Sequence, residues 1–171
     1  MKLFKSKFFR LNALYFSLFA ITIVLLSIIF ISTINKKIEE KNNFIFLNSL
    51  KNFEKEVFLT YQFQRKSGDS IWFTSNVYKK LKPFFASNPI FNNGYGFIFD
   101  VNGKLLIHPL REDDFVWNYD WAEKVFTSNY KFGKITFISK QDNRKQILYY
   151  KYFAPYKIYI AAIATAQDIN S

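Results

Sequence analysis

The stretch "GYGFIFDVNGKLLIHP", from Gly94 to Pro109, predicts two short strands joined by a tight turn. On both sides of residues 100–103 ("DVNG"), aromatic or branched side chains recur with a period of two. Such alternation, interrupted at Asn-Gly, is a strong signal for a β-hairpin. Asp100 is expected to cap the turn by accepting hydrogen bonds from backbone N–H groups. The hairpin ends at His108, the single histidine of the chain, and the proline after it cannot extend the pairing.

Three further strands are expected downstream, at residues 134–139, 145–153 and 157–164. Only short turns separate them, so consecutive strands should pair antiparallel. Between them and the hairpin, "YDWAEKVFTSN" (residues 119–129) predicts two or three helical turns. With the helices upstream, this order predicts an α+β domain whose five-stranded antiparallel sheet carries its helices largely on one face.

Two helices are expected before the hairpin. Residues 36–65 contain neither Gly nor Pro, and an apolar stripe recurs there at spacings of three and four, formed by Phe46, Leu50, Phe53, Val57 and Tyr61. The stripe has two explanations, packing against its own domain or a homodimer seam, and the sequence does not separate them. A second amphipathic helix should follow with Asp69 or Ser70 as its N-cap and end near Pro83.

The region before these helices predicts a membrane anchor. Residues 11–34 run for 24 positions without a charge, a Gly or a Pro, and about 20 apolar residues cross a bilayer as a helix. A cleaved signal peptide is the alternative, but the run exceeds the usual apolar region of such peptides and no convincing cleavage site follows. The basic leader, residues 1–10, places the N-terminus in the cytoplasm. We therefore expect a single-pass protein of a bacterial inner membrane, with a stalk helix (residues 35–66) and an extracytoplasmic domain (residues 67–171), the whole outer unit covering about residues 36–169.

Charge and composition restrict the function classes. The net charge is +11, of which +4 lies in the leader, and the remaining +7 is scattered along the chain, which argues against nucleic-acid binding. The chain has no cysteine, so disulfides, thiol catalysis and cysteine metal sites are excluded. With one histidine and no glycine-rich phosphate loop or metal-ligand cluster, we expect neither an enzyme nor a cofactor.

Three segments resemble the single Cache domain, the PAS-like extracytoplasmic sensor of bacterial chemoreceptors and sensor kinases. They are the hairpin stretch, "YYKYF" around Lys151, and the closing "YKIYIAAIATAQDI". The resemblance covers about residues 44–169. Tyr156 and Ala162 stand where the family usually carries Trp and Gly. The family's second membrane helix and output domain do not follow before Ser171, so a truncated receptor is one expectation.

The resemblance implies a pocket for a small organic acid between the sheet and its covering helices. If the inner faces of the first, second and fourth strands converge, they form an aromatic cup with an imidazole and an ammonium group, which suits a carboxylate. The candidate ligand-binding residues are His108, Lys151, Tyr95, Phe97 and Tyr149, with Arg65, Trp72 and Arg111 for the helical wall and lid. Alternatively, His108 is a hydrogen-bonded core residue and Lys151 a solvated charge.

These expectations describe a membrane-anchored sensor for a small metabolite, a carboxylate or amino acid, acting in signal transduction or chemotaxis. Its partners would be a second copy bound through the stalk helix or a separate signalling protein. The competing hypothesis is a membrane-anchored interaction protein whose cup is filled by its own Phe and Tyr side chains.

Overall fold

The chain begins with one long helix, α1 (Lys2–Ser67). The computed structural model describes residues 2–68, 73–111, 114–128, 131–140 and 142–166, with side chains from Asn12 onward. The chain divides into two compact units, Met1–Lys41 and Asn42–Ser171. In the first unit, α1 is long and apolar enough to cross a membrane, with a mean hydropathy of 2.7 in its most apolar window. The expected membrane helix is therefore present as a helix of suitable length.

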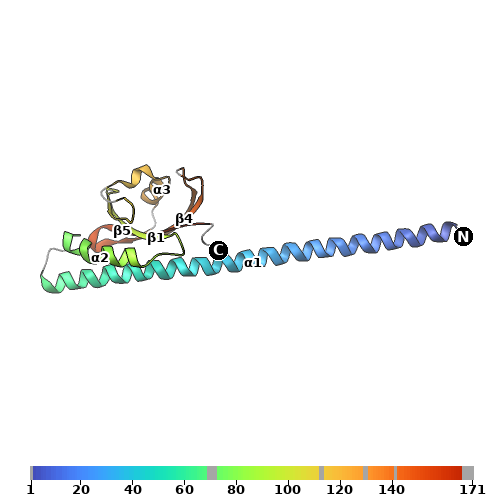
Figure 1. Cartoon of the computed structure of the whole chain (residues 1–171), viewed down its shortest axis with the longest axis horizontal. Coiled ribbons are helices and arrows are strands. Elements are labelled where there is room, and N and C mark those ends of the chain that lie inside the picture. Colours follow the sequence, from blue (N-terminus) through green and yellow to red (C-terminus); the bar gives the residue numbers. More distant parts are fainter. Residues whose placement is uncertain (1, 69–72, 112–113, 129–130, 141, 167–171) are drawn as a thin grey trace. The chain divides into compact units, whose positions relative to one another are not determined.

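The second unit is built on a five-stranded sheet (Figure 1). Its strands are β1 (Tyr95–Asp100), β2 (Leu105–Ile107), β3 (Phe132–Ile138), β4 (Lys145–Phe153) and β5 (Ile158–Thr165). They lie in the order β2-β1-β5-β4-β3, and every neighbouring pair is antiparallel. The predicted α+β fold with a long N-terminal helix is confirmed.

The hairpin between β1 and β2 has the predicted turn. Asp100 Oδ1 accepts hydrogen bonds from the backbone N–H groups of Asn102 (2.8 Å) and Lys104 (2.9 Å). Gly103 has φ +84°, a conformation that side chains disfavour. A bulge between Ile98 and Phe99 shifts the register, which the alternating pattern alone did not predict.

One face of the sheet is covered by α1 and α2 (Ser75–Ser87) (Figure 1). The stripe predicted on α1 is buried there: Phe46 stacks on Tyr149 of β4 with ring centroids 4.9 Å apart, and Phe53 stacks on Phe85 of α2 at 4.5 Å. Gly96 of β1 leaves room for the Phe53 ring, because a Cβ at that position would clash with it. The stripe therefore packs against its own domain, and its explanation as a homodimer seam is wrong.

The second helix differs from its prediction at its C-terminal end. Pro83 lies inside α2 rather than at its end, and the helix continues to Ser87. Phe85, which follows the proline, is buried against Phe53, and this packing offsets the hydrogen bond that Pro83 cannot donate. The predicted N-caps Asp69 and Ser70 lie outside the described residues, and the N-cap of α2 is Thr74.

The opposite face carries a second, separate core. Short elements cover it, the 3-10 helix η1 (Val116–Asn118) and α3 (Ala122–Thr127), and Figure 1 shows α3 across the sheet from α1 and α2. A further 3-10 helix, η2 (Ala154–Tyr156), joins β4 to β5. Trp121 is buried in this core, with its ring 5.6 Å from Phe97 and 5.4 Å from Phe99. The sheet thus separates two cores with different covers.

Candidate functional site

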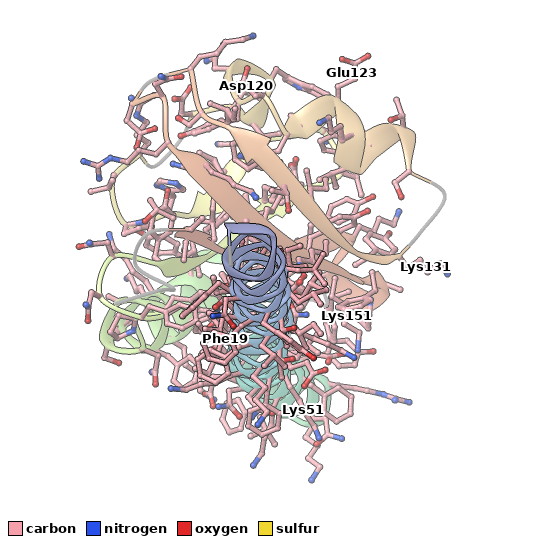
Figure 2. All side chains as sticks on the ribbon, turned by 90° about the vertical axis from the view of Figure 1, so that its right-hand side faces the viewer. Phe19, Lys51, Asp120, Glu123, Lys131 and Lys151 are labelled. Atoms are coloured by element: carbon pink, nitrogen blue, oxygen red, sulfur yellow. The ribbon has the colours of Figure 1, made fainter. Side chains whose placement is uncertain are left out.

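The predicted site residues do not share one cup, because they lie on opposite faces of the sheet. Tyr149 and Lys151 of β4 belong to the face that α1 covers, as their register with Ala162 and Ile160 of β5 shows. Phe97 pairs with Ala161 and belongs to the face that α3 covers. Figure 2 shows Lys151 and Asp120 on the two sides of the sheet. The expected convergence of the strand faces is therefore wrong.

The face under α3 contains a partly enclosed cavity of about 80 Å³, here named the His108 cavity. The sheet contributes Tyr95 and Phe97 from β1, Phe137 from β3 and Gln146 from β4. The remaining polar or aromatic lining comes from His108, Asn118, Tyr119, Asp120, Trp121, Ser139 and Lys140. Three of the eight predicted residues, His108, Tyr95 and Phe97, meet in this cavity. Trp121, Tyr119, Asp120 and Lys140 escaped prediction because only tertiary packing brings their loops to the hairpin.

His108 is 5% exposed, and its ring packs edge-on against Tyr95 (centroids 5.0 Å apart) and Phe97 (5.5 Å). Its Nδ1 accepts hydrogen bonds from the backbone N–H groups of Leu110 and Arg111, both at 3.1 Å. A nitrogen that accepts hydrogen bonds carries no proton, so these partners assign the neutral tautomer with its proton on Nε2. The Nε2 of the imidazole is therefore an N–H donor. Its Nδ1 holds the turn after β2 by accepting the two backbone hydrogen bonds.

Two phenols stand beside the histidine. Burial raises the pKa of Tyr95 to about 12, with a further contribution from Tyr119, while Arg111 opposes the shift. Burial also raises the pKa of Tyr119, against the lowering effect of Arg111, whose side chain forms a hydrogen bond with it. Both phenols thus keep their protons at neutral pH. Arg111 is half exposed, and its Nη1 lies 3.9 Å from Asp114 Oδ2; it does not line the cavity itself but acts on the two phenols that do.

An ion pair joins two loops that line the cavity. Lys140 Nζ lies 2.8 Å from Asp120 Oδ1, and the Lys140 backbone N–H donates to Asp120 Oδ2 at 3.0 Å. The hydrogen bond from Lys140 lowers the pKa of Asp120, and the same bond raises the pKa of Lys140. The pair therefore ties the segment before α3 to the turn between β3 and β4.

The predicted residues on the other face serve to hold α1. Lys151 Nζ forms an ion pair with Glu54 of α1 (2.6 Å to Oε1 and 2.7 Å to Oε2). The hydroxyl of Tyr149 donates a hydrogen bond to Asn43 Oδ1. Arg65 is exposed on α1, which covers the face opposite the cavity, and Trp72 lies outside the described residues. Lys151, Tyr149 and Arg65 are not part of the lining of the His108 cavity.

A larger but open groove of about 460 Å³ adjoins the other side of His108. It lies between α2 and the hairpin, where Lys82, Phe85 and Leu110 contribute to its walls. Fewer polar side chains line this groove than line the His108 cavity. In the part of the chain that the structure describes, no group of three or more His, Asp or Glu side chains could hold a metal ion. The His108 cavity is thus the better candidate site for a small polar ligand.

Comparison with known proteins places the fold. No protein-family model and no curated protein matches the sequence. A Cache chemosensory domain, solved to explain its recognition of carboxylic acids, aligns with a TM-score of 0.58 at 11% identity, over 77% of this chain and 97% of that domain. A structure of a methyl-accepting chemotaxis protein from Vibrio parahaemolyticus aligns with a TM-score of 0.47 at 12% identity, over 78% of this chain and 99% of that one.

A histidine kinase extracellular domain aligns with a TM-score of 0.48 at 12% identity, over 55% of this chain. This chain covers only 39% of that domain, about two fifths of its length. The chain has the fold of a Cache sensor domain, as its hairpin motif predicted.

Proposed function

We propose that this protein is a membrane-anchored sensor whose outer domain binds a small carboxylate in the His108 cavity. One observation carries the proposal: a small, partly enclosed cavity lined by the polar side chains of Tyr95, Tyr119, Ser139 and His108, with the Arg111 guanidinium acting on the two lining phenols. Donors of this kind in a partly dry site suit a carboxylate. The carboxylic acid-recognising Cache domain of the same fold supports this choice.

The size of the cavity restricts the ligand. Its volume is about 80 Å³, whereas drug-sized ligands need roughly 300 Å³ or more. We therefore propose a ligand of a few non-hydrogen atoms, such as acetate or propionate.

Coupling to the helix follows from the alternation of β1. Phe97 faces the cavity, while its neighbours Gly96 and Ile98 face α1 and α2. A ligand that favours one position of Phe97 thereby favours one packing of Phe53 against the sheet. Signalling requires that the two packings differ in ligand affinity. The cytoplasmic N-terminus and the extracytoplasmic domain belong to this proposal.

Arg111→Gln is expected to weaken acetate binding by about tenfold, since a hydrogen bond to a charged group contributes about 1.5–3 kcal/mol and 1.4 kcal/mol is tenfold. The full chain in detergent, titrated with acetate and propionate and followed by thermal shift, gives the measurement. Arg65→Gln is the matched control, because Arg65 is exposed on α1 on the opposite side of the sheet. If none of a panel of short carboxylates raises the melting temperature of the wild type, the proposed ligand class is refuted.

The proposed signalling partner is a second copy of this chain. With Phe46, Phe53 and Val57 facing its own sheet, α1 presents a different stripe to solvent, spaced by three and four residues: Phe44, Leu47, Lys51, Glu54 and Phe58. Such spacing suits helix–helix packing. Two copies anchored in one membrane run parallel, so each position of the stripe meets its equivalent in the other copy. The apolar layers at Phe44, Leu47 and Phe58 then flank the layer at Lys51, while Glu54 keeps its ion pair with Lys151 of its own chain.

Phe58→Glu is expected to reduce disulfide cross-linking through a cysteine placed at Lys51, because it puts two carboxylates into an apolar layer of the seam. The chain has no cysteine, so that single cysteine reports only the seam. Leu59→Glu is the matched control: Leu59 and Phe58 are both 44% exposed, but Leu59 lies off the stripe. Equal cross-linking in the two variants would exclude this surface.

A further inference from the structure

The turn after β2 is held by a side chain rather than by a backbone ladder. Residues 108–111 leave the hairpin at a proline, where pairing stops. There the Nδ1 of His108 accepts the N–H groups of Leu110 and Arg111, each at 3.1 Å. The backbone position of Arg111, and with it the origin of its guanidinium, therefore depends on one imidazole nitrogen.

Arg111 is the cation that this turn places beside two phenols of the cavity lining. Its side chain forms a hydrogen bond with Tyr119 and interacts electrostatically with Tyr95, and both phenols line the His108 cavity. The ring of His108 packs against the same two residues, at 5.0 Å from Tyr95 and 6.4 Å from Tyr119. The histidine and the arginine thus belong to one cluster.

We propose that His108 is a positioning residue for Arg111 and acts only while its imidazole is neutral, which makes ligand binding sensitive to acid. The role of Arg111 in this inference rests on the proposed function. The dependence of the turn on His108, here called the His108 lock, rests only on the two hydrogen bonds to Nδ1. A protonated Nδ1 cannot accept a hydrogen bond, so acid would release both backbone N–H groups at once. His108 is the only histidine in the chain, so it is the one imidazole that acid can protonate.

The described residues near the ring carry charges of both signs. Arg111 from the turn and Lys82 from α2 are cations, and Tyr95 and Tyr119 are neutral phenols. Asp114 lies beside Arg111 at 3.9 Å, and Asp120 lies beside Lys140 at 2.8 Å. Asp114 and Asp120 thus each lie beside a cation of their own, and a protonated His108 would lie near the cations Arg111 and Lys82.

Two variants separate the lock from simple loss of packing. In His108→Asn, the side-chain oxygen can accept the N–H group two residues later, as asparagine does in Asx turns, and it does not titrate. His108→Ala keeps neither the acceptor nor the ring. We expect His108→Asn to retain acetate binding without acid sensitivity, and His108→Ala to bind about tenfold more weakly at every pH, like Arg111→Gln.

The first experiment uses the full chain in detergent micelles, labelled with ¹⁵N-histidine and with ¹⁵N at Leu and Arg, and needs no ligand. At pH 7.5 we expect one ring species with its proton on Nε2. On acidification, the amide signals of Leu110 and Arg111 should shift with the same midpoint as the ring nitrogens. A proton on Nδ1 at pH 7.5, or amides that stay unchanged while the ring protonates, would overturn the proposal.

The second experiment measures acetate affinity from pH 7.5 to 5.5, a range in which acetate stays mostly ionised. The wild type should lose about tenfold in affinity towards pH 5.5, while His108→Asn should change by less than about threefold. Equal acid sensitivity in both proteins would refute the positioning role. If no protein binds acetate, the proposed function fails, and the nuclear magnetic resonance experiment alone decides the lock.

Discussion

Trp121→Ala is expected to cause the largest loss of stability, about 3–5 kcal/mol, as large aromatic truncations in well-packed cores do. Trp121 is 1% exposed and lies between Phe97, Phe99 and Tyr119 at centroid distances of 5.4–5.6 Å. Its removal joins a new void to the His108 cavity. Because about 1 kcal/mol corresponds to 2–4 °C in a protein of this size, thermal unfolding of the full chain in detergent should show a fall of roughly 10 °C.

Trp117→Ala provides the matched control for this prediction. Trp117 is the same residue type on the same side of the sheet, but it is 55% exposed and donates one hydrogen bond from Nε1 to Asn102. Its loss should cost a fraction of the Trp121 effect. Equal destabilisation by the two substitutions would show that the α3 face is not the packed core described above.

Gly96→Ala is expected to destabilise the domain by about 1–3 kcal/mol, the usual cost of overpacking a core. The added Cβ would fall within van der Waals contact of the Phe53 ring, which cannot retreat because it stacks on Phe85. The ring and α1 must shift together. Chemical denaturation of the detergent-solubilised chain would measure the loss.

A double-mutant cycle tests whether contact with the Phe53 ring causes the destabilisation by Gly96→Ala. Phe53→Leu removes the ring edge that the new methyl group meets, so Gly96→Ala should cost less in the Phe53→Leu background than in the wild type. Gly133→Ala is not a suitable control, since Tyr150 lies against Gly133 in the same way. Additive costs within about 0.5 kcal/mol would contradict direct contact between residues 53 and 96 as the cause.

The two faces of the sheet bear differently on the two competing hypotheses, a ligand-binding sensor and an interaction protein whose cup is filled by its own aromatic side chains. On the α1 face, Phe46, Phe53 and Tyr149 fill the space that a cup would have needed, as expected for an interaction surface built on its own aromatic side chains. On the α3 face, Tyr95, Tyr119 and His108 line a partly enclosed cavity. The cavity thus lies on one face of the sheet, while the other face is filled by the side chains that anchor α1.

Local patterns in the sequence predicted the elements well. The alternation around "DVNG" predicted the hairpin and its Asp100 cap, and the bounds of the strand over residues 145–153 coincide with β4. The stripe on α1 was identified residue by residue. These features depend on neighbours two to four positions apart, so the sequence contains the information directly.

The composition of the site required the tertiary structure. The alternation of side chains along a strand indicates that the strand has two faces, but it does not indicate which element covers each face. Lys151 and His108 therefore looked equally suitable as ligand residues, until Glu54, 97 positions from Lys151, proved to be its partner. The bulge in the hairpin, the central place of β5 and the loops that bring Trp121 and Lys140 to His108 depend on contacts between distant segments. By itself the sequence determined the strands, the helices and the motif, whereas the side of the sheet that holds the cavity was decided only when both covers packed.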